Sequence, residues 1–231
     1  MFGYATRVVT VVGVLLTALV GTAAQADTSG QQRVVERARL ALDAFLDDPH
    51  FEHMPVYVQN AYGVLIIPEM LRAGFFFGAQ HGVGVLLVRD PSTGAWGQPA
   101  FYSLYGGSFG LQFGGQSSDV VLTIMNQGAV HKLVDSDVKL KFGADAGLAV
   151  GRVGAGIGAG TTLHFGEDIY AFAKSKGLYG GFTVDGTVVV PNHDWNRAYY
   201  GRPVEPAEIV RSRTLVASNG VESLHQALTR F

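Results

Sequence analysis

The chain has 231 residues, with 17 basic and 19 acidic side chains that leave a formal charge of −2 at pH 7. A chain so close to neutrality has no overall field that would attract nucleic acid. It contains no cysteine, which excludes a disulfide framework, a thiol nucleophile and a cysteine-linked lipid anchor.

The first 26 residues have the pattern of a secretory signal peptide. Arg7 precedes an apolar stretch from Val8 to Val20, and Ala24-Gln25-Ala26 supplies a small-x-small cleavage site. The apolar stretch is shorter than the roughly 20 residues of a membrane span, and an uncleaved anchor is the alternative. We expect an exported protein, periplasmic or secreted, whose residues 27–231 form a single domain.

An amphipathic helix is expected directly after the signal peptide. Ser29-Gly30-Gln31-Gln32 has the spacing of a capping box, and Asp47-Asp48-Pro49 ends the pattern. Apolar side chains recur at helical spacing between these limits, at Val34/Val35, Ala38, Ala41/Leu42 and Phe45/Leu46. The helix also carries three arginines: Arg33, Arg37 and Arg39. A shorter helix is expected from Pro55 to Ala61, because proline suits a first helical turn.

The central part of the chain has the period of strands and holds most of the 31 glycines. Glycine supplies turns, bulges and close backbone approaches between branched and aromatic residues that suit a pleated surface. The expected strands are Val64 to Pro68, Phe75 to Phe77, Val83 to Val88, Phe101 to Tyr105 and Val120 to Met125. Lys139 to Thr162 is a long alternating stretch, and Leu178 to Val190 has the pattern of a hairpin turning at Asp185-Gly186.

After Gly201 the pattern is helical again, with Val221, Leu224 and Leu228 on one face. Helices at both ends of a strand-rich block predict an α+β fold. We expect an antiparallel sheet, strongly curved or partly barrel-like, that is flanked by N- and C-terminal helices.

Several segments match a known family in the right order and cover most of residues 31–201. They are Ala61–Pro68, Ala73–Phe75, Gly82–Leu86, Trp96–Tyr102, Gly110–Gly114, Gly151–Gly154, Ser175–Gly181, Asn196 and Tyr199–Gly201. On these residues the chain resembles the SYLF domain family.

The resemblance implies a phospholipid-binding module. Eukaryotic SYLF domains bind phosphoinositides through a basic amphipathic N-terminal helix, and some engage actin. The helix role would fall here on Arg33, Arg37 and Arg39, with apolar side chains such as Leu42 and Phe45 entering the membrane. The same apolar face is what the domain would use to dock the helix on its sheet, so both interpretations stay open. An exported chain would meet no actin, which leaves an anionic phospholipid membrane as the implied partner.

Further basic residues lie in the strand-rich block: Lys139, Lys141, Arg152, Lys174 and Lys176. They would form a second lipid-contacting patch if their strands were adjacent, and an exposed strand surface is the alternative. Six aromatic residues suit either an interfacial belt or the core, and we expect the core. They are Trp96, Phe101, Tyr102, Tyr105, Tyr199 and Tyr200.

Patterns that resemble catalytic or cofactor sites have the wrong surroundings. Gly106-Gly107-Ser108-Phe109-Gly110 has the Gly-x-Ser-x-Gly spacing of a hydrolase nucleophile, but strand-like alternation follows it where a helix is required. We expect Ser108 to be a small residue in a turn and the protein to have no catalytic residue. The stretch from Gly154 to Gly160 lacks the third glycine of a dinucleotide loop, and no cofactor is expected.

No metal site is expected either. His50 and His53 stand between two prolines without a further ligand nearby and are expected in a solvent-facing loop. Four aspartates match no calcium loop and are expected in solvated turns: Asp119, Asp135, Asp137 and Asp145.

The sequence therefore predicts an exported, non-catalytic phospholipid-binding protein that associates peripherally with anionic membranes. No nucleic acid partner is expected. The alternatives are a structural or adaptor protein of the cell envelope with an unknown protein partner, an outer-membrane barrel, and a serine hydrolase built on Ser108.

Overall fold

The computed structural model describes residues 28–74, 77–109, 114–135, 140–141, 150–153, 160–165, 169–176, 187–212, 215 and 220–231. The helices in these ranges are α1 (Ser29–Leu46), the 3₁₀ helix η1 (Pro49–Phe51), α2 (Met54–Asn60), α3 (Gln127–Val134), α4 (His193–Tyr200), α5 (Pro206–Arg211) and α6 (Val221–Thr229). The strands are β1 (Gly63–Gly74), β2 (Phe77–Val88), β3 (Ala100–Phe109), β4 (Gly114–Ile124), β5 (Leu140–Lys141), β6 (Val150–Val153), β7 (Gly160–Phe165), β8 (Ile169–Lys176) and β9 (Thr187–Pro191).

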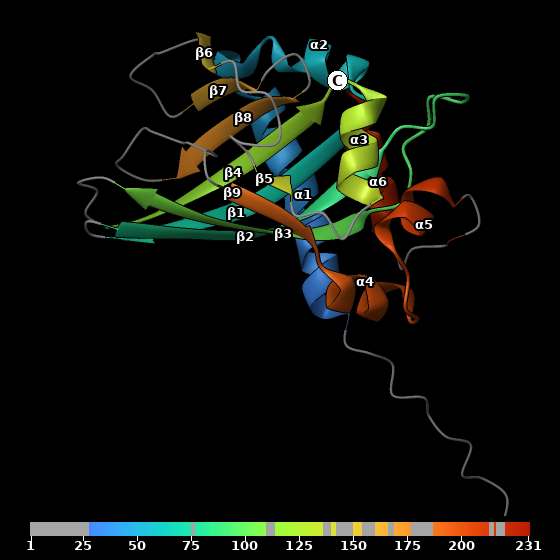
Figure 1. Ribbon diagram of the computed structural model, residues 1–231. Coiled ribbons are helices and arrows are strands. Elements are labelled where there is room, and N and C mark those ends of the chain that lie inside the picture. Colours follow the sequence, from blue (N-terminus) through green and yellow to red (C-terminus); the bar gives the residue numbers. More distant parts are fainter. Residues whose placement is uncertain are drawn as a thin grey trace, which may run out of the picture.

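The strands form one sheet in the order β5-β9-β3-β2-β1-β4-β8-β7-β6. Every pairing between named strands is antiparallel. Within the described residues no pairing joins the two edge strands β5 and β6, so the sheet is open. The expected α+β fold, with a curved antiparallel sheet between N- and C-terminal helices, is confirmed (Figure 1).

Helices cover both faces of the sheet and create two apolar cores. On one face α1, α2 and α6 pack over β1 to β4, and on the other α3 and α5 pack over the same strands (Figure 1). The first residues of β1, from Gly63 to Ile67, are buried at every position because their side chains meet a core on either face. Each described helix is too short or too polar to cross a membrane.

The N-terminal helix has the predicted extent but not the predicted cap. Thr28 is the N-cap residue and makes no side-chain cap bond, while the Ser29 hydroxyl accepts a long hydrogen bond from Arg33 Nη1 at 3.4 Å. The capping-box prediction is therefore wrong. The second helix, α2, has its proline in the first turn as predicted.

A bulge in β1 changes which side chains face the core. The register of β1 against β4 shifts between Ile67 and Met70, and Glu69 within the bulge has a left-handed φ of 66°. Asp119 on β4 holds this backbone, because its Oδ1 accepts a hydrogen bond from Glu69 N at 3.1 Å. Asp119 is only 2% exposed, so a solvated turn was the wrong expectation for it.

A buried polar row ties the strands together beyond the bulge. Arg72 Nη2 on β1 donates to Gln80 Oε1 on β2 at 2.9 Å, and Gln80 Nε2 donates to Thr187 Oγ1 on β9 at 2.6 Å. The last bond passes over β3 at Gly106, where an added Cβ would lie 2.5 Å from Gln80 Nε2. The missing side chain of Gly106 makes room for this bond. Burial lowers the pKa of Arg72.

Two helices were not predicted. In α3 and α4 the residue before the helix is an asparagine whose side chain accepts a backbone hydrogen bond, Asn126 from Ala129 N at 2.7 Å and Asn192 from Trp195 N at 3.1 Å. These short helices interrupt strand-rich sequence. The C-terminal helical pattern is confirmed by α5 and α6. The expected turn at Asp185-Gly186 lies outside the described residues, as do residues 1–26 and 154–159.

Candidate functional site

The arginines of α1 lie on two different sides of the helix. Arg37 forms an ion pair with Glu69 of the β1 bulge, and the exposed Arg33 lies one turn earlier on the same side. Arg39 instead contacts Glu36 at 2.7 Å and Asp43 at 2.6 Å. The hydrogen bond from Arg39 lowers the pKa of Glu36, and the same contact raises the pKa of Arg39. Two of the three predicted basic residues are thus largely neutralised by neighbouring carboxylates.

The apolar face of α1 is used by the core. Val35, Ala38, Leu42 and Phe45 belong to the cluster between the helices and the sheet, with Leu42 fully buried. The docking interpretation of this face is confirmed, and Leu42 and Phe45 are not available to a membrane in this structure. Leu40, on the outside of the helix, remains 51% exposed.

The basic residues of the strands are not all on adjacent strands of the described sheet. Lys141 and Arg152 lie on β5 and β6, which are the opposite edges of the strand order. Lys174 on β8 donates to the Ala44 carbonyl at 2.8 Å and pairs with Asp48 at 2.9 Å, so it binds the C-terminal end of α1. Lys176 ends β8 opposite Ser117. Lys139 lies outside the described residues.

Part of the sheet face that carries α1 has no helix over it among the described elements. In Figure 1 the ends of β1 to β4 extend past α1 on the left of the view. Exposed side chains that the structure describes on this face, here called the outer sheet patch, include Leu71, Ala73, Ala79, His81 and Tyr105. They are neighbours, because Leu71 pairs with His81, His81 pairs with Tyr105, and Ala73 pairs with Ala79.

The outer sheet patch exposes large apolar surface beside α1. Leu71 is 53% exposed and Tyr105 50% exposed, and the Tyr105 ring lies 4.9 Å from the His81 ring. Tyr105 was expected in the core, where Trp96, Phe101, Tyr102 and Tyr199 are indeed buried. The patch begins two residues after Glu69, the partner of Arg37. Arg37 therefore lies at the edge of the patch, and Arg33 lies one turn earlier on the same side of α1.

A hollow of about 440 Å³ adjoins this patch at Tyr105. Ser103, Asn192, His193 and Trp195 line its other sides. These side chains combine ring surface with hydrogen-bonding groups.

The patterns that resembled catalytic or metal sites have structural explanations. β3 continues through Ser108 to Phe109 and β4 begins at Gly114, so Ser108 lies in a strand and not in the expected turn. His50 and His53 are highly exposed, as expected, with Asp48 and Glu52 as their partners. In the part of the chain that the structure describes, no three His, Asp or Glu side chains are grouped to hold a metal ion.

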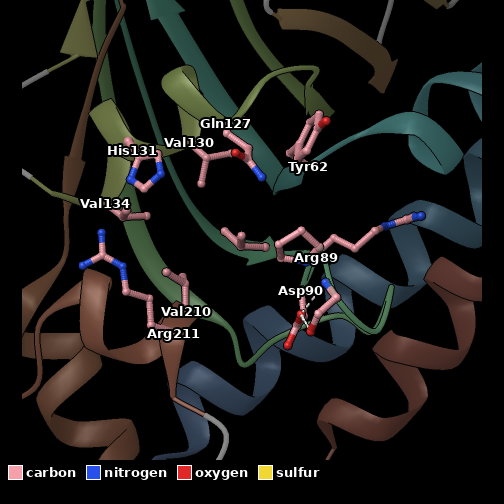
Figure 2. Close-up of a pocket in the computed structure, with 12 residues that line it drawn as sticks. Tyr62, Arg89, Asp90, Gln127, Val130, His131, Val134, Val210 and Arg211 are labelled. Carbon is pink, nitrogen blue, oxygen red and sulfur yellow. Dashed lines mark hydrogen bonds between the residues drawn. The ribbon is translucent and has the colours of Figure 1, made fainter.

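A second pocket, of about 420 Å³, lies on the opposite face between α3, α5 and the turn after β2. We call it the α3–α5 pocket. Figure 2 shows Val130, Val134 and Val210 at this site, with His131 and Arg211 on one side and Asp90 on the other. Arg89 points away from it, because its guanidinium donates to the Gln59 and Val58 carbonyls at the end of α2.

The charged side chains at this pocket are held in place by others. Asp135 at the end of α3 accepts from Arg211 Nη2 at 2.6 Å and contacts His131 Nδ1 at 3.1 Å. The hydrogen bond with His131, followed by that from Arg211, lowers the pKa of Asp135. Asp90 Oδ1 accepts from Ser92 N at 2.8 Å and from Ser92 Oγ at 2.6 Å, which closes the turn on itself.

Comparison with known proteins decides the family. The model of the Ysc84 family, described as "Las17-binding protein actin regulator", matches residues 105–231, which is more than half of the chain. The chain belongs to the Ysc84 (SYLF) family.

Curated relatives are similar over most of this chain. SH3 domain-containing YSC84-like protein 1 of Xenopus laevis is 27% identical over 148 residues, or 64% of this chain and 43% of the relative. The protein of the same name from Bos taurus is 25% identical over 178 residues, or 77% and 51%. Protein YSC84 of Saccharomyces cerevisiae is 27% identical over 164 residues, or 70% and 34%. The chain thus spans about half or less of these relatives. No solved structure was found to match it.

The family match covers different parts of the outer sheet patch and of the α3–α5 pocket. It begins at Tyr105 and runs to the C-terminal helix, so it includes α3 and α5 but neither α1 nor Leu71. Sequence reasoning missed the exposure of Leu71 and Tyr105. Nothing in the local sequence indicates the bulge at Glu69 or the point where the helices stop covering the sheet. It also missed the α3–α5 pocket, whose lining residues come from separate parts of the chain between Tyr62 and Arg211. Relatives in the Ysc84 family are named as binding or regulatory proteins and not as enzymes.

Proposed function

We propose that this protein is an exported, non-catalytic phospholipid-binding protein that associates peripherally with anionic membranes. The proposal is supported by the SYLF resemblance and by one structural observation, the apolar outer sheet patch with Arg37 at its edge. An exposed apolar surface rimmed by polar and charged groups is typical of interaction sites.

The outer sheet patch changes the mechanism that the amphipathic helix suggested. Because Leu42 and Phe45 are core residues, apolar contact with lipid would come from Leu71 and Tyr105. Burial of each half-exposed side chain would contribute about 1 kcal/mol. Arg33 adds about 1 kcal/mol near an anionic surface before salt screening, and Arg37 adds less while it is paired with Glu69. The sum predicts weak, reversible attachment.

Sedimentation of residues 27–231 with neutral and anionic liposomes, at low and high salt, tests this proposal. We expect binding to anionic vesicles that weakens with salt. A Leu71→Ser/Tyr105→Ser double variant should lose most of the bound fraction, and Arg33→Glu should lose part of it. The matched control is Arg197→Glu, an exposed arginine of α4 that pairs with Asp194 within its own helix. Equal loss in this control would show a general charge effect and contradict the proposed surface.

A second candidate function is that of a protein-binding adaptor in the cell envelope. The observation in its favour is the description of the family, which is named for binding the protein Las17. Absence of sedimentation with either vesicle type would favour this adaptor role. The outer sheet patch would then be a protein contact, and the same Leu71→Ser/Tyr105→Ser variant should lose the partner.

A further inference from the structure

The α3–α5 pocket has the size of a small-ligand site. Its volume of about 420 Å³ lies near the lower end of the roughly 300–1,000 Å³ of small-molecule pockets. A whole two-chain phospholipid is too large for it. The pocket also lies on the face of the sheet opposite the outer sheet patch, because α3 and α5 cover one face and α1 the other.

The inner wall of the pocket is aliphatic. Val130 and Val134 belong to the buried core cluster on this face, and Val88 and Val210 pack against it while remaining partly accessible. Tyr62 adds the edge of an aromatic ring at the other end (Figure 2). Such a wall stabilises a ligand with a hydrocarbon body, since burying apolar surface is favourable and the wall offers few hydrogen-bonding groups.

Charge is distributed unevenly around the rim. Arg211 and His131 lie together on one side, where both contact the Asp135 carboxylate, and Asp90 lies on the other (Figure 2). Asp135 binds Arg211 through Nη2, and a guanidinium has further N–H donors with which it can bind a ligand carboxylate. A ligand with one carboxylate would place it at Arg211, away from the carboxylate of Asp90.

We propose that the α3–α5 pocket binds a small aliphatic monocarboxylate, with its carboxylate at Arg211 and its hydrocarbon body against Val130, Val134 and Val210. His131 provides a second polar contact beside the carboxylate. The site is independent of the proposed membrane association, because it uses other residues on the opposite face.

Calorimetric titration of the full chain with sodium octanoate tests the proposal. We expect saturable binding to one site. Arg211→Gln should weaken it about tenfold, because a charge-assisted hydrogen bond is lost. Val210→Trp should abolish it by filling the pocket. Arg202→Gln is the matched control, since Arg202 is an exposed arginine that pairs with Glu208 outside the pocket lining, and it should bind as the parent does.

Two related ligands test the orientation of octanoate. 1-Octanol has the same chain without the carboxylate, and suberate carries a second carboxylate that would approach Asp90. Both should bind at least about tenfold more weakly than octanoate. Circular dichroism establishes that each variant is folded. The proposal is overturned if octanoate shows no saturable binding, if Arg211→Gln or Val210→Trp binds octanoate like the parent while folded, or if suberate binds as tightly as octanoate. None of these outcomes depends on liposome binding.

Discussion

Asn196 shows how one buried side chain connects a helix to the sheet. It is fully buried on α4, its Oδ1 accepts from Phe101 N at 2.7 Å, and its Nδ2 donates to Phe101 O at 3.3 Å. Asn196→Ala would leave the Phe101 N–H buried without a partner and should lower the free energy of unfolding by about 2 kcal/mol. Urea denaturation measures the change. Asn60→Ala alters an exposed asparagine at the end of α2. It should change the free energy of unfolding by no more than about 0.5 kcal/mol.

Asp48 gives the protein a predictable response to acid. The hydrogen bond from Lys174, and then those from His50, hold the pKa of Asp48 well below its usual range. A carboxyl whose pKa is depressed by folding stabilises the protein above its unfolded pKa of about 4. That contribution is lost as the pH falls from about 4 towards the folded pKa.

Asp48→Asn should therefore reduce the free energy of unfolding at neutral pH by about 1 kcal/mol. It should also flatten the decline in stability below about pH 4. Urea denaturation across the acid range, with Asp194→Asn as the control, measures both effects. Asp194 belongs to a highly exposed pair on α4, so an equally flattened profile in this control would contradict the assignment to Asp48.

At the scale of elements, α1 stabilises the fold through its inner face. Leu42 is fully buried in the core beneath α1, while Leu40 on the same helix is 51% exposed. Leu42→Ala should cost about 3 kcal/mol of unfolding free energy, because it removes core contacts and leaves a cavity. Leu40→Ala should change the free energy of unfolding by no more than about 0.5 kcal/mol. Similar losses for both leucines in chemical denaturation would mean that α1 does not dock with Leu42 inside and Leu40 outside.

The pairing of β1 with β2 depends on close backbone approach beside the bulge. A Cβ added at Gly84 would lie 2.4 Å from the Ile66 carbonyl oxygen and 2.9 Å from Ile67 Cγ1. Gly84→Ala should therefore force the strands apart and destabilise the protein by about 2 kcal/mol. At Gly107 the nearest such atom is 3.9 Å away, and Gly107→Ala should be nearly neutral. Thermal unfolding of the two variants compares them directly.

At the scale of the whole molecule, the sheet separates two cores. Leu42 packs in the core under α1, and Leu133 of α3 packs in the core on the opposite face. The two leucines share no core cluster. The decrease in unfolding free energy in the double variant should therefore equal the sum of the decreases in Leu42→Ala and Leu133→Ala, to within about 0.5 kcal/mol. A double-mutant cycle in urea measures the coupling. A coupling above about 1 kcal/mol would show that the sheet transmits strain between its faces.

The helices at both ends were predictable because their apolar residues repeat along one face, as Val35, Ala38 and Leu42 do in α1. The strand block was predictable from branched residues and glycines. The short helices α3 and α4 were missed, since each is an eight-residue element set in strand-rich sequence and its asparagine cap is a weak local signal. The sequence identified the candidate basic residues, but it could not show their ion-pair partners. Glu69, the partner of Arg37, lies far along the chain.

The sequence by itself determined the fold class, the family and the elements with strong periodicity, because these depend on local spacing and on the order of short segments. Only the tertiary structure decided that the apolar face of α1 is in the core, that Leu71 and Tyr105 are exposed, and that α3 and α5 enclose a pocket. The physical reason is that the local sequence around an apolar or charged side chain is the same whether that side chain contacts a partner or water. What covers each face depends on elements that are distant in the chain and close only in space.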